Sequence, residues 1–237
     1  MNRQAFDALI LAGGRSSRLG GVPKQSLVFQ GQTLLERAVA AAAGARQTVV
    51  VGDMGPLASE ARPSQALSPP TLPPNVLTCR EEPHFSGPAA AIAAGVDALV
   101  ERGGPAPAPY TLVLACDMPL ASQAVAVLQD ALALVTAGRC SGVMARAEDA
   151  RAQPLLGFYR TAELTKACAD LAARNALVNG SVRALLANLD VQLVTVPAGS
   201  TSDVDTWDDA AALGVAAGNQ SGSQDRHSGG ANVGGNS

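Results

Sequence analysis

The residues best suited to chemistry gather near the start of the chain, in a glycine-rich loop with basic and hydroxyl side chains. Gly13 and Gly14 let the backbone adopt positive φ values and approach a ligand closely, and successive amides in such a turn form an anion-binding concavity. The side chains that would neutralise a polyphosphate or donate hydrogen bonds to it are those of Arg15, Ser16, Ser17, Arg18 and Lys24. The loop predicts a phosphate site, although a basic surface loop without a ligand has the same composition.

Two familiar phosphate-binding loops do not fit this stretch. A Walker A loop ends in Gly-Lys-Ser or Gly-Lys-Thr, whereas Lys24 lies between Pro23 and Gln25. A dinucleotide fingerprint needs Gly-x-Gly-x-x-Gly, and the stretch from Gly13 to Gly21 contains no Gly-x-Gly.

A second chemical feature is Asp117, which directly follows the apolar run 112–116. A buried strand there would deliver the carboxylate to its carboxyl end, and Pro119 would stop the strand. A carboxylate at this position can bind Mg²⁺, an ion that commonly bridges a protein carboxylate and substrate phosphates. The alternative, a turn or helix-capping role for Asp117, stays open on these residues alone, with Ser122 as the more natural cap.

Apolar runs alternate with helical patterns in the elements that must position these residues. Strands are expected at 6–12, 47–52, 76–80, 110–115, 142–145, 155–159 and 191–196. Helices are expected at 33–43, with a capping box of Thr33 and Glu36, and at 88–102, 122–137, 161–173, 181–188 and 206–217. This cadence predicts an α/β fold of three layers, a mostly parallel sheet with helices on both faces. Such sheets bind ligands beyond the carboxyl ends of their strands, at a switch in strand order.

We expect residues 1–217 to form a single domain. The segment 55–75 holds six prolines and is expected to be a flexible surface excursion. Residues 218–237 are mostly Gly, Ser, Asn and Gln, too polar to bury a core, so a disordered low-complexity tail is expected there.

The composition limits which kinds of binding partner and which cellular compartment are expected. A net charge of −3 argues against a nucleic-acid partner. No run of about 18 apolar residues occurs, and Asp7 interrupts the apolar stretch that a signal peptide would need. The four cysteines form no Cys-x-x-Cys pair, which is typical of buried cytosolic thiols. We therefore expect a cytoplasmic protein that binds no membrane.

The motif Leu11-Ala12-Gly13-Gly14-x-Ser16-x-Arg18-Leu19-Gly20-x-x-x-Lys24 resembles the signature loop of the nucleotidyltransferases that include molybdenum cofactor guanylyltransferase. Cys116-Asp117-Met118-Pro119 resembles the metal-binding motif of the same family, in which the aspartate holds the Mg²⁺ of the nucleotide. The resemblance implies a Rossmann-like nucleotidyltransferase fold. It covers roughly residues 6–213.

Asp205 is similar to the Asp or Asn that precedes Thr-Pro-Glu-Asp in the family's closing motif, although Trp207 stands where the family usually has proline. The resemblance implies that Asp205 approaches the metal from the side opposite Asp117. Acidic residues also favour a helix N-terminus without any metal, so that alternative stays open.

The resemblance also implies a set of nucleotide-binding residues. Glu82 falls where the guanylyltransferases tend to have an aspartate that contacts the nucleotide, Gly52 falls where they often have asparagine, and Gly87 opens the helix that closes over the nucleotide. The implied nucleotide-binding set is Leu11, Ala12, Gly13, Gly14, Arg15, Ser16, Ser17, Lys24, Gly52, Glu82, Gly87 and Asp117. The implied catalytic residues are Arg18, Lys24 and Asp117, the implied metal ligands are Asp117 and Asp205, and Gln153 or Arg183 is expected to face the acceptor.

The family's reaction would be transfer of GMP from GTP to the phosphate of molybdenum-molybdopterin, with release of pyrophosphate. The related cytidylyltransferases usually have Leu-Ala-Ala-Gly and Asp-Gln-Pro where this chain has Leu-Ala-Gly-Gly and Cys-Asp-Met-Pro, which favours GTP. Implied partners are GTP, a molybdopterin-type acceptor and, transiently, molybdenum cofactor biosynthesis or acceptor proteins. The alternatives are a molybdenum cofactor cytidylyltransferase, a sugar-phosphate or other small-molecule NTP transferase, and a non-catalytic nucleotide-binding protein.

Overall fold

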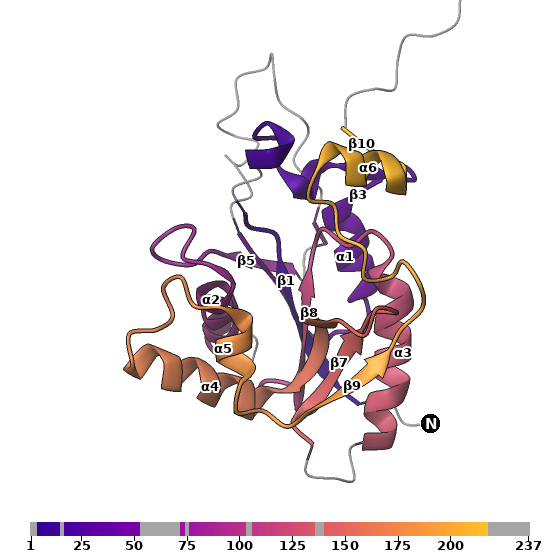
Figure 1. Cartoon of the computed structure of the whole chain (residues 1–237). Helices are drawn as coiled ribbons and strands as arrows, with labels where there is room; N and C mark the ends of the chain where they lie inside the picture. The colour runs from indigo at the N-terminus through magenta and orange to yellow at the C-terminus, as the bar shows by residue number, and fades with distance from the viewer. Residues whose placement is uncertain are drawn as a thin grey trace, which may run out of the picture.

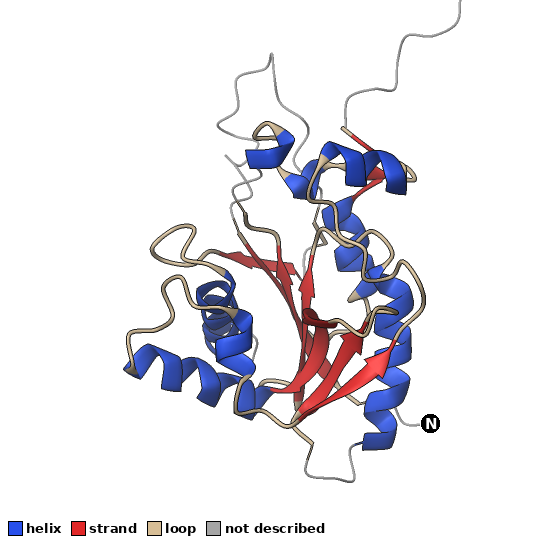
Figure 2. Ribbon diagram, in the orientation of Figure 1, coloured by secondary structure: helices blue, strands red, loops and turns tan. Residues whose placement is uncertain are grey.

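A seven-stranded sheet forms the centre of the molecule (Figures 1 and 2). The computed structural model describes residues 4–14, 17–52, 72–73, 76–102, 106–135 and 140–217. The strand order is β5 (Val76–Cys79), β4 (Thr48–Val51), β1 (Phe6–Leu11), β6 (Tyr110–Ala115), β8 (Ala152–Arg160), β7 (Gly142–Arg146) and β9 (Val191–Thr195). β6 pairs in parallel with β1, and β8 is antiparallel to both of its neighbours, so the predicted mostly parallel sheet is confirmed.

The strand order reverses next to β1. From β1 the chain moves outward to β4 and then β5, and it returns to the other side of β1 as β6. Loops that leave neighbouring strands in opposite directions open a crevice at the carboxyl edge of the sheet. The glycine-rich loop follows β1 and Asp117 follows β6, so both lie at this crevice.

Two apolar cores cover the two faces of the sheet. Alternate residues of β1 divide between them: Phe6, Ala8 and Ile10 face one core, and Leu9 and Leu11 face the other. The first core is closed by α1 (Leu34–Ala41) and α3 (Ala121–Val135), and the second by α2 (Pro88–Arg102), α4 (Thr161–Ala173) and α5 (Val182–Leu186). These helices lie on opposite sides of the sheet in Figure 1 and form the predicted three layers.

Local capping signals explain where several helices begin. At α1 the Thr33 side chain accepts from the amide of Glu36 at 3.1 Å, and the Glu36 carboxylate accepts from the amide of Thr33 at 2.7 Å. The predicted capping box is therefore confirmed. The expectation that Ser122 caps α3 is wrong, because α3 already begins at Ala121 and Ser122 lies inside the helix.

A second, small sheet joins the end of the described chain to its first hairpin. Its order is β10 (Val215–Ala216), β2 (Val28–Phe29) and β3 (Gln32–Thr33). A separate apolar cluster beneath it contains Leu19, Leu27, Phe29, Leu34, Val204, Ala210 and Val215. This cluster packs α6 (Trp207–Leu213) against the glycine-rich loop region, above the main sheet in Figure 1.

The expected helix at 206–217 is too long. The helix ends at Leu213 because Gly214 adopts a left-handed φ of 74°, and the chain then pairs as β10. Most of the segment 55–75 and all of the tail 218–237 lie outside the described residues.

Candidate active site

The glycine-rich loop leaves β1 between two neighbouring strands. The amide of Ala12 donates to the carbonyl of Val51 at 2.8 Å, and the amide of Cys116 donates to the carbonyl of Leu11 at 3.0 Å. Gly13 and Gly14 line a cavity of about 240 Å³ at this edge of the sheet, and Gly14 has a φ of 149°. Arg15, Ser16 and the side chain of Ser17 lie outside the described residues.

Gly52, at the end of β4, supports the loop from behind and is not among the residues that line the cavity. Its φ is 148°, and a Cβ at this position would lie 2.6 Å from the amide nitrogen of Gly13 and 2.8 Å from the carbonyl carbon of Ala12. Such contacts are too short to exist, so only glycine lets the two strand ends approach this closely.

Replacing Gly52 by alanine is expected to displace the loop. We expect nucleotide binding to weaken by about tenfold and the free energy of unfolding to fall by about 1–3 kcal/mol, the usual range for overpacking. Nucleotide titration and denaturant unfolding would measure the two effects. Gly31→Ala is the matched control, because Gly31 also has a positive φ of 80° but a Cβ there meets nothing within 4 Å. Wild-type binding by Gly52→Ala would contradict the supporting role.

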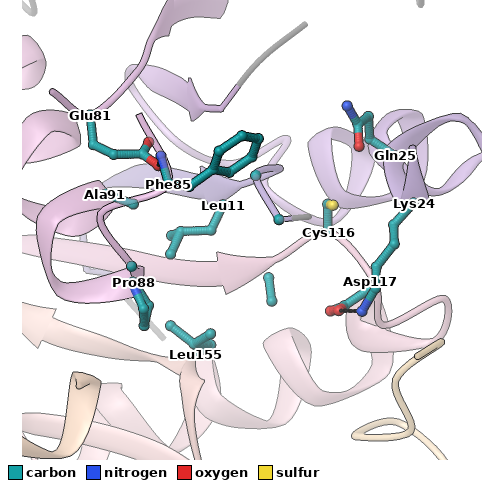
Figure 3. A pocket seen from close by; sticks show the side chains of 14 residues that line it. Leu11, Lys24, Gln25, Glu81, Phe85, Pro88, Ala91, Cys116, Asp117 and Leu155 are labelled. Carbon is teal, nitrogen blue, oxygen red and sulfur yellow. Dashed lines mark hydrogen bonds and ion pairs between the residues drawn. The ribbon is translucent and has the colours of Figure 1, made fainter. Parts of the chain in front are cut away.

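Lys24 and Asp117 meet at one end of the cavity, and Asp205, which does not line the cavity, contacts the same lysine. The Lys24 ammonium donates to Asp117 Oδ2 at 2.9 Å and also to Asp205 Oδ1. Figure 3 shows the Lys24 and Asp117 side chains pointing toward each other at the edge of the cavity. Arg18 Nη1 lies 3.8 Å from Asp205 Oδ2, and the Arg18 side chain is 74% exposed. The structure thus brings together Arg18, Lys24, Asp117 and Asp205 from three distant parts of the sequence.

Backbone contacts hold the two aspartates in place. The amide of Val204 donates to the carbonyl of Asp117 at 3.0 Å, which ties the segment before α6 to the turn after β6. Thr206 and Asp209 form a capping box at α6, and Asp209 Oδ2 also accepts from the amide of Asp205 at 3.1 Å. The carboxylates of Asp205 and Asp117 thus share the Lys24 ammonium, and the assignment of Asp205 as a metal ligand stays a prediction.

The charges in this cluster are unevenly balanced. Burial alone would lower the pKa of Lys24, but the carboxylates of Asp117 and Asp205 outweigh it and raise that pKa. Burial raises the pKa of the Asp117 carboxyl against the opposing Lys24 ammonium, and Asp203 and Asp205 raise it further. Lys24 faces the carboxylates of Asp117 and Asp205, the exposed Arg18 lies 3.8 Å from Asp205, and the charge of Asp203 also acts on Asp117. Three carboxylates thus face two basic side chains, so the site can accept another cation.

The donor set fits a magnesium ion. Two carboxylates are hard oxygen ligands, and Mg²⁺ is usually held by one or two carboxylates together with substrate phosphates and water. Across the described part of the chain, no group of three or more His, Cys, Asp or Glu side chains could hold a metal by itself. The phosphates of a nucleotide would therefore have to complete the coordination.

The other end of the cavity is apolar apart from one carboxylate. Leu11, Pro88, Ala91 and Leu155 line it, and Figure 3 shows Glu81 there, away from the Lys24–Asp117 pair. Glu81 is only 6% exposed. Its Oε1 accepts from the amide of Phe85 at 3.1 Å, whereas its Oε2 is buried and has no hydrogen-bond partner among the described residues.

Of the residues that the sequence predicted near this end, only some line the cavity. Gly87 lines the cavity with a φ of 89° directly before α2. Glu82 does not line it; its side chain is 79% exposed and lies 3.8 Å from Arg80 Nε. Gln153 and Arg183, the expected acceptor residues, are also not among the lining residues. The carboxylate at the cavity is that of Glu81, the neighbour of the residue named by the motif.

A family model for the MobA-like NTP transferase domain matches residues 8–194. The chain belongs to this family. The MobA-like match contains the glycine-rich loop, Lys24 and Asp117, and it ends before Asp205. None of the curated proteins matches the chain in sequence.

Solved structures agree with the MobA-like fold. The chain is similar to molybdopterin-guanine dinucleotide biosynthesis protein A from Archaeoglobus fulgidus, with 18% identity, a TM-score of 0.59 and coverage of 88% of this chain and 96% of that one. Rv0371c from Mycobacterium tuberculosis has 24% identity, a TM-score of 0.59 and coverage of 89% and 98%. The 2-C-methyl-D-erythritol 4-phosphate cytidylyltransferase from Thermus thermophilus has 20% identity, a TM-score of 0.57 and coverage of 89% and 97%.

Two further findings concern metals and membranes. A structure of Rv0371c in complex with manganese resembles this chain with a TM-score of 0.55 and 22% identity. Within the described ranges of this MobA-like chain, none of the helices combines the length and the apolar character needed to cross a membrane.

Sequence reasoning missed Glu81 and Phe85 as residues of the cavity. Both lie in the stretch between β5 and α2, where no helical or strand period indicates which side chains point inward. The sequence did contain one signal, the pair Glu81-Glu82 next to Pro83. Side chains of adjacent residues in an extended segment point in different directions, so either of the two carboxylates could have been the one at the sheet edge.

Proposed function

We propose that this MobA-like NTP transferase moves GMP from GTP to the phosphate of molybdenum-molybdopterin and releases pyrophosphate. The observation that carries the proposal is the two-ended cavity. Lys24, Asp117 and Asp205 provide a cation and two carboxylates at one end, and the buried Glu81 carboxylate lies at the other. A nucleoside triphosphate needs this arrangement, with charge-binding groups for the phosphates and a polar acceptor beside an apolar wall for the base.

In the proposed reaction an acceptor phosphate oxygen attacks the α-phosphorus in line, and the bond from that phosphorus to the pyrophosphate oxygen breaks. Catalysis of this kind depends on positioning and charge neutralisation more than on covalent chemistry. Lys24 and Arg18 neutralise the departing pyrophosphate, and the amides of Gly13 and Gly14 bind its oxygens. Asp117 and Asp205 would hold Mg²⁺, which supplies charge neutralisation to the phosphate oxygens.

Glu81 supports guanine as the base. Its Oε2 is buried and has no hydrogen-bond partner among the described residues, and an unpaired buried polar atom is costly, so a ligand that donates to this oxygen is favoured. The Watson–Crick edge of guanine offers donors at N1 and N2, whereas cytosine offers only its N4 amino group. A carboxylate at the base end of the cavity therefore favours GTP over CTP.

The choice of acceptor is based on similarity to solved structures. The similar Archaeoglobus fulgidus protein is named for molybdopterin-guanine dinucleotide biosynthesis, which supports a molybdopterin-type acceptor. The likeness to the Thermus thermophilus cytidylyltransferase, with nearly the same TM-score, keeps CTP-dependent transfer as the second candidate. The proposal includes a cytoplasmic location and transient contact with molybdenum cofactor biosynthesis or acceptor proteins.

A thermal-shift panel of GTP, CTP, ATP and UTP, each with and without Mg²⁺, tests the base. We expect the largest rise in Tm with GTP and Mg²⁺, since at equal concentrations the ligand that binds the folded state most tightly stabilises it most. Glu81→Gln is expected to weaken GTP binding by about 10- to 100-fold, because hydrogen bonds to charged groups contribute about 1.5–3 kcal/mol.

Glu82→Gln is the matched control, because Glu82 is a neighbouring carboxylate that is exposed. A selective shift by CTP would overturn the choice of base. Nucleotide binding without Mg²⁺-dependent pyrophosphate release, across candidate acceptors, would favour the non-catalytic alternative.

A further inference from the structure

Phe85 differs from the three other phenylalanines of the chain. Phe6, Phe29 and Phe158 are 3%, 7% and 0% exposed, as expected for core residues, whereas Phe85 is 40% exposed. Its ring lines the cavity next to Leu11 and close to Glu81 (Figure 3). Ligand pockets are lined predominantly by hydrophobic and aromatic side chains, so an aromatic ring in the wall of a cavity is suited to contact a ligand.

The backbone holds Phe85 in an unfavourable conformation. Its φ is 59°, in the left-handed region that side chains with a Cβ avoid. The buried Glu81 carboxylate accepts from the Phe85 amide at 3.1 Å, and the carbonyl of the next residue, Ser86, accepts from the amide of Asn179 at 2.6 Å. Residues held in this way cluster at ligand sites, where the surroundings fix a side chain in a required direction.

The ring of Phe85 is also supported from the loop. The His84 ring stacks on it with a centroid distance of 3.9 Å and an angle of 21° between the planes. The remaining cavity walls near Phe85 are the aliphatic side chains of Leu11 and Ala91. Lys24, proposed to bind the phosphates, and Asp117, proposed to hold their metal ion, lie at the other end of the cavity in Figure 3. A flat, apolar part of the ligand therefore belongs beside Phe85.

We propose that Phe85 stacks on the nucleobase of the bound nucleoside triphosphate and that Glu81 positions Phe85 through its amide. This inference rests on the proposed function. Every nucleobase has a π-face, so stacking is tolerant of base identity. Phe85 thus sets the affinity for nucleotides in general, whereas Glu81 Oε2 selects the base.

The test compares GTP and ATP with inorganic tripolyphosphate, which has the phosphates but no base, in titrations of the full chain with Mg²⁺. Phe85→Gly removes the ring and also relieves the positive φ. We expect it to weaken GTP and ATP binding by about tenfold, the size of effect usual for removal of one aromatic–base stack. Binding of tripolyphosphate is expected to stay unchanged.

Phe85→Tyr keeps the ring and is expected to bind GTP within about twofold of the wild type. An unchanged GTP affinity in Phe85→Gly would overturn the stacking role, as would an equal loss of tripolyphosphate binding, which would mean that the loop itself has been disturbed. If the wild type binds neither GTP nor ATP more tightly than tripolyphosphate, the proposed function fails and the stacking role fails with it. Tight GTP binding to the wild type together with an unaffected Phe85→Gly overturns the stacking role alone.

Discussion

Asp117→Asn is expected to lower the rate of nucleotidyl transfer by about 10³-fold, the upper end of the range for loss of one well-placed charge-stabilising group. Asparagine keeps the shape of the side chain but removes the charge that faces Lys24 at 2.9 Å. Without that charge the site loses one of its two carboxylates for a divalent cation. Pyrophosphate release in the presence of GTP, Mg²⁺ and acceptor measures the effect.

The same substitution is expected to leave the fold intact. Burial raises the pKa of the Asp117 carboxyl, so the folded chain holds its charged form less well than the unfolded chain does. Removing that charge at pH 7 therefore takes away an unfavourable contribution to folding. Lys24 keeps Asp205 as a partner, so no buried charge is left unpaired. We expect the free energy of unfolding to change by less than about 2 kcal/mol.

Asp203→Asn is the matched control for this prediction. Asp203 is exposed and raises the pKa of Asp117 through its charge, and the structure records no ion pair for it among the described residues. It should retain nearly the wild-type rate. Wild-type turnover in a folded Asp117→Asn protein would refute the assignment of Asp117 to the reaction.

Lys24→Ala is expected to lower turnover by about 10²–10³-fold through loss of a charge-stabilising donor. The opposite effect is expected for metal binding without nucleotide. In the wild type the Lys24 ammonium lies between Asp117 and Asp205, in the place where a cation would be held. Removing it leaves the exposed Arg18, 3.8 Å from Asp205, as the remaining basic group beside the two carboxylates, and their weaker neutralisation favours uptake of a divalent ion.

Titration with Mn²⁺, followed by its electron paramagnetic resonance signal, would measure this second effect. We expect tighter Mn²⁺ binding in nucleotide-free Lys24→Ala than in the wild type. Lys166→Ala is the control, because Lys166 also forms an ion pair with an aspartate, Asp170, but at an exposed position on α4. Unchanged turnover, or weaker Mn²⁺ binding in Lys24→Ala, would contradict this role for the lysine.

Local signals in the sequence were sufficient for most of the helices and strands. The capping box at Thr33 and Glu36, the Gly-Pro start of α2 and the apolar run of β6 each depend on interactions within a few residues. Such short-range features can be read from the order of residues alone. The loop from Gly13 to Lys24 and the position of Asp117 after β6 were predictable for the same reason.

Strand order and strand direction required the tertiary structure. A strand that is buried on both faces has the same apolar pattern in a parallel and an antiparallel pair, so nothing in the pattern indicated that β8 runs against β6. The pairing of β10 with β2 was equally hidden, since each strand has only two residues. Only the left-handed Gly214 marked the end of α6, and a glycine after a helix was a signal that could have been used.

The residues of the site also fall into those that the sequence indicated and those that only the tertiary structure revealed. The sequence by itself indicated which side chains are expected to carry the chemistry: the lysine and glycines of the first loop, Asp117, and an acidic residue before the last helix. Only the tertiary structure decided that Lys24 meets a carboxylate 181 positions away, that Glu81 and not Glu82 faces the cavity, and that Phe85 lies beside it. The reason is physical: residue type and local spacing determine what a side chain can do, whereas the packing of distant segments determines what it touches.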